Sequence, residues 1–192
     1  MTPAAIEAAL GAYTPRARPR ERAFRAAAVL VPLLERPGGV ELLFTLRPAD
    51  MPTHAGQVSF PGGKVAPDDA DTWAAAAREA EEELGVGLPA LRRVGTLDDL
   101  PTISDFHVTP HVAWLDPAAP LTPSPREVAE IFTVPLERLA DPRERRLMSG
   151  RARRTGQVVR MPFFLGGRPH VIWGVTAAIL WNLLDVLALH GE

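Results

Sequence analysis

The hydrophobic positions of the chain fall into short apolar runs separated by segments rich in Pro, Gly and Arg. Runs of this kind, bounded by turn residues, predict β-strands rather than long helices. The predicted strands are Phe24–Leu34, Val40–Leu46, Gln57–Phe60, Arg92–Leu97, His107–Leu115, Glu130–Val134, Val158–Phe164 and His170–Trp173. Pro37-Gly38-Gly39 joins the first two runs and predicts a hairpin there.

Three segments have helical patterns: Met1–Tyr13, Asp71–Leu84 and Thr176–Leu189. In the central one, Asp71 suits the N-cap and Gly85 suits the residue just after the helix. Strands with helices at the start, middle and end of the chain predict an α/β fold, an α/β/α sandwich with a mixed sheet between helical layers. At 192 residues we expect a single domain, residues 1–192.

The composition narrows the function by exclusion. A net charge of −2 gives no bulk attraction to nucleic acid or to an anionic membrane, so we expect neither as a partner. The absence of cysteine excludes thiolate nucleophiles and cysteine metal sites. The N-terminus does not resemble a signal peptide, and Val171–Leu189 is interrupted by Asn182 and Asp185. We therefore expect a cytoplasmic protein.

The central helix carries an acidic cluster in the run Arg78–Val86, which reads REAEEELGV. At 3.6 residues per turn, Glu82 and Glu83 lie about 60° and 40° to either side of Glu79. These three carboxylates share one stripe, whereas Glu81 points away from it. An apolar stripe lies beside them and is expected to pack on the sheet. It consists of Trp73, Ala77, Ala80 and Leu84.

Carboxylates packed this closely raise one another's pKa values unless a cation compensates. Mg²⁺ accepts such oxygen ligands, so a metal cluster accounts for the stripe. The preceding Phe60-Pro61-Gly62-Gly63-Lys64 fits the same picture, because Gly62 and Gly63 let the backbone approach a ligand closely. Two simpler interpretations stay open: the glutamates are solvated and paired with Arg78, and Pro-Gly-Gly is a tight turn.

Together, Gly63 and Arg78–Val86 resemble the signature of the Nudix hydrolases, GX5EX7REUXEEXGU with U aliphatic. The second half matches, with Ala80 a small occupant of the first U position. The first half departs from the pattern, because one extra residue stands between Gly63 and Arg78.

The place of the early glutamate of the signature falls on Ala70, flanked by Asp69 and Asp71. In the family that glutamate is mainly structural, so the departure concerns an ion pair with Arg78 more than the chemistry. We expect Asp69 or Asp71 to substitute for it.

Upstream, Leu43–Arg47 and His54–Gly63 look like the additional signature of the Nudix coenzyme A diphosphatases, approximately LLTXR(S/A)X3RX3GX3FPGG. Two positions fail, since Pro48 replaces the small residue and Pro52 the second basic one. Leu100–Ser104 and Ile172–Ala177 are also typical of that subfamily, and the similarity runs from about residue 24 to residue 189.

This resemblance implies a Mg²⁺- or Mn²⁺-dependent enzyme that hydrolyses coenzyme A to 4′-phosphopantetheine and adenosine 3′,5′-bisphosphate. The segment that matches the Nudix signature, called the Nudix box, spans about residues 63–86, and its glutamates are called the box glutamates. The metal ligands carried over are Glu79, Glu82 and Glu83, with the Gly63 carbonyl as an additional ligand. The base is a box glutamate or Glu127 from a later loop, although Glu127 is equally readily an ordinary loop acid.

Arg47 is the first candidate for binding a phosphate, because the planar guanidinium binds phosphate through two donors. His54, Gly62 and Gly63 are further candidate substrate contacts. The histidines have no metal-ligand spacing, and apart from His54 we assign them, with Trp173 and Trp181, to polar or core positions. A basic run reads either as a phosphate-contacting loop or as a solvated loop. It contains Arg143, Arg145, Arg146, Arg151, Arg153 and Arg154.

Two alternatives to coenzyme A hydrolysis remain open. One is a Nudix diphosphatase acting on ADP-ribose, another nucleoside diphosphate derivative or a nucleoside triphosphate, which the failures at Pro48 and Pro52 favour. The other is a non-catalytic Nudix module that binds a nucleotide or a protein. The presence of all three box glutamates argues against it. The sequence allows a monomer or a homodimer.

Overall fold

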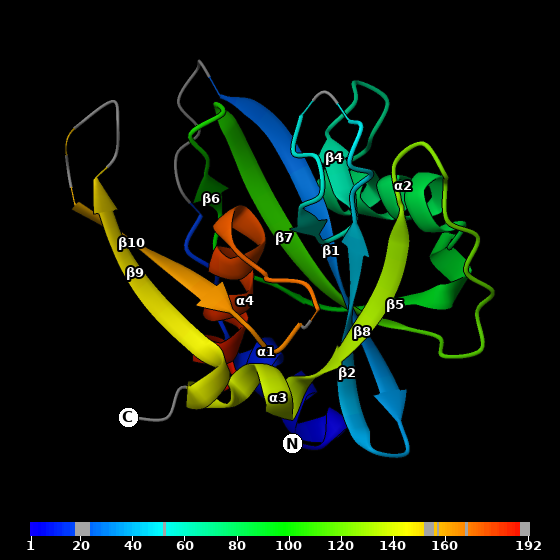
Figure 1. The fold of residues 1–192 in the computed structure, drawn as a ribbon. Coiled ribbons are helices and arrows are strands. Elements are labelled where there is room, and N and C mark those ends of the chain that lie inside the picture. Colours follow the sequence, from blue (N-terminus) through cyan, green and yellow to red (C-terminus); the bar gives the residue numbers. More distant parts are fainter. Residues whose placement is uncertain (18–23, 52, 152–155, 157, 168, 189–192) are drawn as a thin grey trace.

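The computed structural model describes residues 1–17, 24–51, 53–151, 156, 158–167 and 169–188. Its centre is a twisted sheet in the order β3-β2-β1-β7-β5 (Figure 1). These strands are β1 Arg25–Arg36, β2 Gly39–Leu46, β3 Val58–Ser59, β5 Leu91–Thr96 and β7 Phe106–Leu115. The predicted hairpin is confirmed, since β1 and β2 pair antiparallel up to Arg36 and Gly39.

Three further strands join this sheet: β4 (Gly62–Lys64) pairs with β1, β6 (Leu100–Pro101) with β7, and β8 (Glu130–Pro135) with β2. The β1–β7 pair is parallel and the other pairs are antiparallel. The predicted mixed α/β architecture is therefore confirmed.

The two faces of β1 carry different helices. Ala28 and Leu30 pack with the alanine-rich α2 (Thr72–Leu84). The alternate residues Val31 and Leu33 belong to the core cluster that includes α1 (Pro3–Ala12) and α4 (Gly174–Val186). Because side chains alternate along a strand, α2 and α4 cover opposite faces, as Figure 1 shows.

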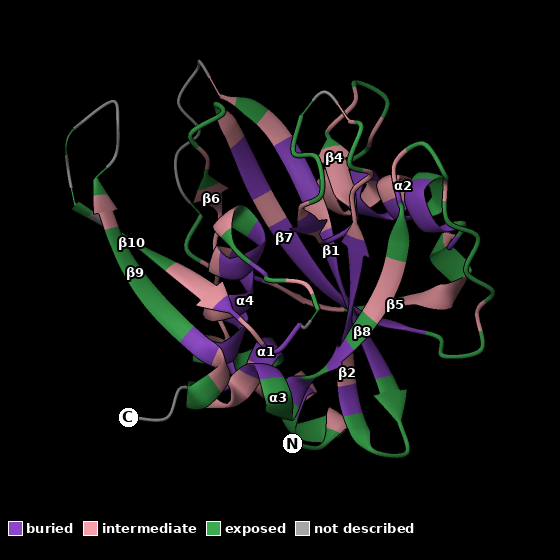
Figure 2. Ribbon diagram, in the orientation of Figure 1, coloured by how far each residue is buried: buried purple, intermediate pink, exposed green. Residues whose placement is uncertain are grey.

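The central strands are buried on both faces, which explains their nearly continuous apolar sequence (Figure 2). On α2 the predicted apolar stripe is confirmed at Ala77, Ala80 and Leu84, which are buried, while Trp73 is half-buried. The helix caps are also as predicted, with Asp71 at the N-cap and Gly85 in the left-handed conformation.

The prediction of a basic loop was wrong. Arg145–Arg151 forms β9, which pairs with β10 (Val158–Phe164) as a separate two-stranded sheet. Arg145 is buried, with its guanidinium carbon 5.8 Å from the centre of the Trp181 ring. Arg153 and Arg154 lie outside the described residues.

Two other interpretations were wrong. The Pro-Gly-Gly segment is no tight turn, because Gly62–Lys64 runs as β4 antiparallel to Val29–Ala27 of β1. The expected strand His170–Trp173 is reduced to one bridge, between Ile172 and Phe164. Trp173 is 45% exposed and caps α4, so it is not a core residue.

The sequence patterns missed the short elements α3 (Leu136–Ala140), β4 and β6 and two turns of 3₁₀-helix, Leu88–Ala90 and Pro142–Glu144. No helix in the described part of the chain has the length and apolar character needed to cross a membrane.

Candidate active site

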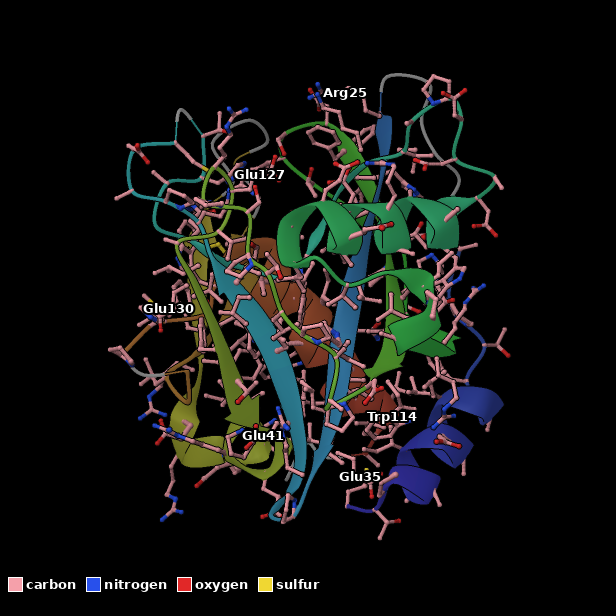
Figure 3. The ribbon with its side chains drawn as sticks, turned by 90° about the vertical axis from the view of Figure 1, so that its right-hand side faces the viewer. Arg25, Glu35, Glu41, Trp114, Glu127 and Glu130 are labelled. Atoms are coloured by element: carbon pink, nitrogen blue, oxygen red, sulfur yellow. The ribbon has the colours of Figure 1, made fainter. Side chains whose placement is uncertain are left out.

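Helix α2 presents its carboxylates beside β4 because both of its ends are fixed. The Asp71 side chain accepts a hydrogen bond from the Ala74 amide at 2.7 Å, which starts the helix. At the other end, the Ser124 amide donates to the Glu83 carbonyl at 2.9 Å. This bond holds the segment that carries Glu127 against the end of α2, where Figure 3 shows Glu127.

Glu83 is the most enclosed acid of the cluster, with 3% of its surface exposed. The Gly62 amide donates to its Oε1 at 3.3 Å. Burial raises the pKa of Glu83 to about 8, and the negative charges of Glu127 and Glu79 add to the rise. The Gly62 hydrogen bond and the positive charge of Arg47 act in the opposite direction.

Glu79 is also largely buried, with 14% of its side chain exposed. Burial is the main cause that raises its pKa, and the neighbouring Arg78 opposes the rise. The Glu79 carboxylate lies so close to Gly63 that a β-carbon at that position would overlap it. A larger residue at position 63 would therefore force the Glu79 carboxylate to move.

Arg78 binds four groups around this cluster. Its Nε and Nη2 donate to the two Asp69 carboxylate oxygens at 3.0 and 3.1 Å, and Nη2 also donates to the Lys64 carbonyl at 3.0 Å. Its Nη1 lies 3.0 Å from both Glu79 Oε1 and Glu82 Oε1. One guanidinium thus connects β4, the following loop and two of the box glutamates.

A NUDIX domain model matches residues 24–153, which is more than half of the chain. The chain belongs to the Nudix hydrolase family. The match begins before β1 and ends after β9, so it contains the acidic helix, β4 and the Glu127 segment.

Similar proteins agree with this assignment. A Nudix hydrolase named NudL from Photorhabdus laumondii is 40% identical over 159 residues, 83% of each chain. A NudL from Escherichia coli is 35% identical over 169 residues, 83% of this chain and 81% of its own. The Nudix family hydrolyses nucleoside diphosphate derivatives with divalent metal ions such as Mg²⁺ or Mn²⁺.

Solved Nudix structures share the fold. RenU, a Nudix hydrolase from M. smegmatis, aligns with a TM-score of 0.51 at 24% identity, over 61% of this chain and 74% of its own. A MutT/nudix family protein from Enterococcus faecalis aligns with a TM-score of 0.52 at 17% identity, over 89% of this chain and 62% of its own.

The departure from the Nudix signature is resolved by Asp69. Its carboxylate pairs with Arg78 and also accepts a hydrogen bond from the Ala66 amide at 2.7 Å. Asp71 is used as the helix cap instead, and Ala70 is exposed. Asp69 therefore forms the ion pair with Arg78 that the Nudix signature assigns to its early glutamate.

The predicted metal-ligand roles at this Nudix site stay predictions. Among the described residues, no three acidic or histidine side chains converge into a ready-made cation site. Two of the predicted ligands are paired with Arg78 instead, since its Nη1 lies 3.0 Å from both Glu79 Oε1 and Glu82 Oε1. The donor chemistry nevertheless fits, since carboxylate oxygens beside a backbone carbonyl are the ligands that Mg²⁺ and Mn²⁺ prefer.

The candidate substrate residues Arg47 and His54 lie on one loop of the Nudix domain, between β2 and β3. The Arg47 amide donates to the Gln57 carbonyl at 3.0 Å, and its side-chain Nε is buried with no hydrogen-bond partner among the described residues. His54 is exposed, has a φ of 57° and places Nδ1 2.9 Å from Gln57 Oε1.

Sequence reasoning treated His111 only as a polar or core residue. Its Nε2 lies 2.9 Å from Thr72 Oγ1 and its Nδ1 3.3 Å from Thr96 Oγ1. Burial lowers its pKa to about 4, so the ring is neutral at pH 7. It fixes the first turn of the Nudix helix to β7. No local pattern signals this contact, because Thr72 is 39 residues away in sequence.

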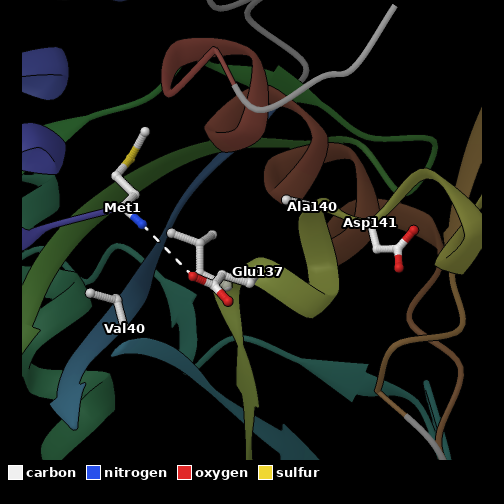
Figure 4. Close-up of a pocket in the computed structure, with 6 residues that line it drawn as sticks. Met1, Val40, Glu137, Ala140 and Asp141 are labelled. Atoms are coloured by element: carbon white, nitrogen blue, oxygen red, sulfur yellow. Dashed lines mark ion pairs between the residues drawn. The ribbon is translucent and has the colours of Figure 1, made fainter. Parts of the chain in front are cut away.

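A surface cavity of about 340 Å³ lies elsewhere on the Nudix domain (Figure 4). It is lined by Met1, Val40, Leu136, Glu137, Ala140 and Asp141. The Met1 amino group lies 4.0 Å from Glu137, whose side chain is 84% exposed. None of the site residues named above lines this cavity, so it has no part in the proposed chemistry.

Proposed function

We propose that this Nudix hydrolase cleaves the diphosphate bond of coenzyme A, giving 4′-phosphopantetheine and adenosine 3′,5′-bisphosphate. The observation that carries the proposal is the hydrogen bond from the Gly62 amide to Glu83. Gly62 belongs to the end of the upstream segment that resembles the coenzyme A signature. The segment associated with that substrate is therefore in direct contact with the box glutamates.

In this proposal Glu79, Glu82 and Glu83, with the Gly63 carbonyl, hold Mg²⁺ or Mn²⁺. The bound metal would neutralise charge on the diphosphate and lower the pKa of an attacking water. Arg78 shields the ligand carboxylates from one another until a cation enters.

The proton of the attacking water goes to a carboxylate oxygen. The two candidate acceptors are Glu83 and Glu127. Glu83 is buried among the acidic side chains, and Glu127 is half-buried and its negative charge raises the pKa of both Glu79 and Glu83 in the metal-free protein. Either carboxylate satisfies the requirement for a base near the metal ligands.

The substrate contacts proposed from the loop before β3 are Arg47 and His54, with Gly62 and Gly63 close to the diphosphate. The buried Nε of Arg47 supports this assignment, because an unpaired charged donor is costly unless a ligand oxygen reaches it. His54 supports it through its left-handed backbone, a conformation that non-glycine residues adopt mostly where function or tight packing requires it.

The proposal is tested by incubating the protein with coenzyme A and Mg²⁺ or Mn²⁺ and separating the products by chromatography. We expect equal amounts of 4′-phosphopantetheine and adenosine 3′,5′-bisphosphate, and no products after chelation of the metal. Unchanged coenzyme A in a preparation that cleaves another diphosphate would contradict the substrate assignment.

The second candidate is hydrolysis of ADP-ribose, another nucleoside diphosphate derivative or a nucleoside triphosphate. It is favoured by Pro48, which stands where the coenzyme A signature has a small residue. Its carbonyl accepts from the Met51 amide at 3.4 Å, so this proline is part of the loop turn. The other departure, Pro52, lies outside the described residues.

A further inference from the structure

We infer that Arg47 binds the diphosphate group at the bond that is cleaved, and not the 3′-phosphate that distinguishes coenzyme A. The inference rests on the proposed coenzyme A hydrolysis for the choice of substrate. The sequence leaves both phosphates open for this arginine. The structure distinguishes between them by the place of Arg47 relative to the acidic helix α2.

The direction of the Arg47 side chain follows from the strand that precedes it. Leu42 and Phe44 of β2 pack in the core cluster of α1 and α4, whereas Leu43 packs with Leu84 of α2. Side chains alternate along an extended chain, so residue 47 projects to the same face as Leu43. Arg47 therefore points toward the face that α2 and its glutamates cover.

The backbone of Arg47 is fixed in this position. Its amide donates to the Gln57 carbonyl at 3.0 Å, and its carbonyl accepts from the Gly56 amide at 3.2 Å. These two bonds close the loop before β3 at its base. The point from which the side chain extends is therefore fixed by the backbone before a ligand binds.

The backbone next to Arg47 is bonded to the segment that carries Glu127. The Leu46 carbonyl accepts a hydrogen bond from the Ala129 amide at 2.8 Å, and the same segment is bonded to the end of α2, where the Ser124 amide donates to the Glu83 carbonyl at 2.9 Å. The Nε of Arg47 has no protein partner in the described part of the chain. A charged donor left unpaired in a buried position is unfavourable, and a phosphate oxygen would satisfy it.

The chemistry of coenzyme A then indicates which of its phosphates Arg47 binds. The diphosphate is attached at C5′ of the ribose and the other phosphate at C3′, so the two lie on different sides of the sugar. The bond that is cleaved must lie at the box glutamates. A guanidinium on the face of the sheet that α2 covers is consequently suited to the diphosphate, and its planar fork suits two phosphate oxygens.

The test compares Arg47→Met with Arg36→Met on coenzyme A and on 3′-dephospho-coenzyme A. Arg36 is an exposed arginine at the far end of the same β1–β2 ladder, so it controls for the loss of charge. We expect Arg47→Met to lower kcat/KM by roughly 10²-fold on both substrates alike. Arg36→Met should match the wild type on both.

A loss confined to coenzyme A would assign Arg47 to the 3′-phosphate and overturn the inference, as would unchanged activity on both substrates. Melting temperatures confirm that the variants fold. If Arg47→Met does not fold, Arg47→Lys, which keeps the charge but not the planar fork, should still lose activity equally on both substrates. If the wild type cleaves only another diphosphate, the coenzyme A proposal fails, and the same variants on that substrate still test Arg47.

Discussion

The ionisable carboxyl group of Glu83 is buried, and this burial makes the free energy of unfolding depend on pH. In the metal-free protein, the folded state holds its proton up to a pKa of about 8, whereas the unfolded chain releases it near 4.5. Between these values the folded state binds more protons than the unfolded state. The free energy of unfolding therefore decreases as pH rises through this window.

We predict that metal-free Glu83→Gln has a higher melting temperature than the wild type at pH 9, on the order of 5–10 °C. The variant keeps the shape of the side chain but carries no charge to bury. The difference should shrink as pH falls from 9 to 7. His111 does not contribute to the pH dependence between 7 and 9, because its pKa is about 4 in the folded protein and 6.5 in the unfolded chain. Equal melting temperatures across the range would contradict the account of Glu83.

Asp69 supports the site through Arg78, and its side chain is 6% exposed. We predict that Asp69→Ala lowers kcat/KM by roughly 10-fold and destabilises the fold by about 1–3 kcal/mol, because Arg78 then loses its main partner. The half-saturating Mg²⁺ concentration should also rise, since Arg78 is left to its contacts with Glu79 and Glu82.

The matched control is Asp68→Ala, which removes an exposed carboxylate from the same loop. It should match the wild type in stability, kcat/KM and Mg²⁺ dependence. If Asp69→Ala behaves like this control, the ion pair with Arg78 has no role in holding the glutamates.

The helical pattern predicted the shared stripe of Glu79, Glu82 and Glu83 but not their different environments. On a helical wheel, Glu82 and Glu83 are nearly symmetric about Glu79. In the structure the Glu82 side chain is 53% exposed, while Glu83 is 3% exposed. The difference comes from β4 and the Glu127 segment, which pack on one side of the helix only.

At the scale of elements, both ends of helix α2 could be predicted because the residues that begin and end the helix act locally. Asp71 and Gly85 act on the backbone within one turn. The strand conformation of β4 could not be predicted from the local sequence, since Pro-Gly-Gly by itself favours a turn. It becomes a strand because β1 offers an antiparallel edge to Gly62–Lys64. The short elements α3 and β6 lack enough residues to show a period.

The N-cap of α2 gives a prediction for this element. Asp71→Ala should lower the free energy of unfolding by roughly 0.5–2 kcal/mol, which is about 1–8 °C in melting temperature. Turnover at 25 °C should change little, because the cap lies at the opposite end of the helix from Glu82 and Glu83. Asp71→Ser, which can still accept the Ala74 amide, should recover most of the stability. A full loss with Asp71→Ser would mean that the charge, not the cap, matters.

For the whole molecule, the sequence predicted the fold class and the family but not the strand order. The parallel pairing of β1 with β7 joins segments about 80 residues apart, from Arg25 with Phe106 to Leu33 with Trp114. No local pattern encodes that pairing. Other long-range contacts bond the Glu127 segment to α2 through Glu83 and to β2 through Leu46. The candidate residues could therefore be named from the sequence, but their geometry could not.

We propose that these residues form a metal-dependent site that cleaves coenzyme A. The most direct measurement is the rate of product formation from coenzyme A with Mg²⁺, for the wild type and for Glu83→Gln. We predict release of 4′-phosphopantetheine and adenosine 3′,5′-bisphosphate by the wild type, and a rate lower by orders of magnitude in a folded Glu83→Gln variant. Wild-type activity in that variant, or intact coenzyme A with a wild type that cleaves ADP-ribose or a nucleoside triphosphate, would contradict the claim.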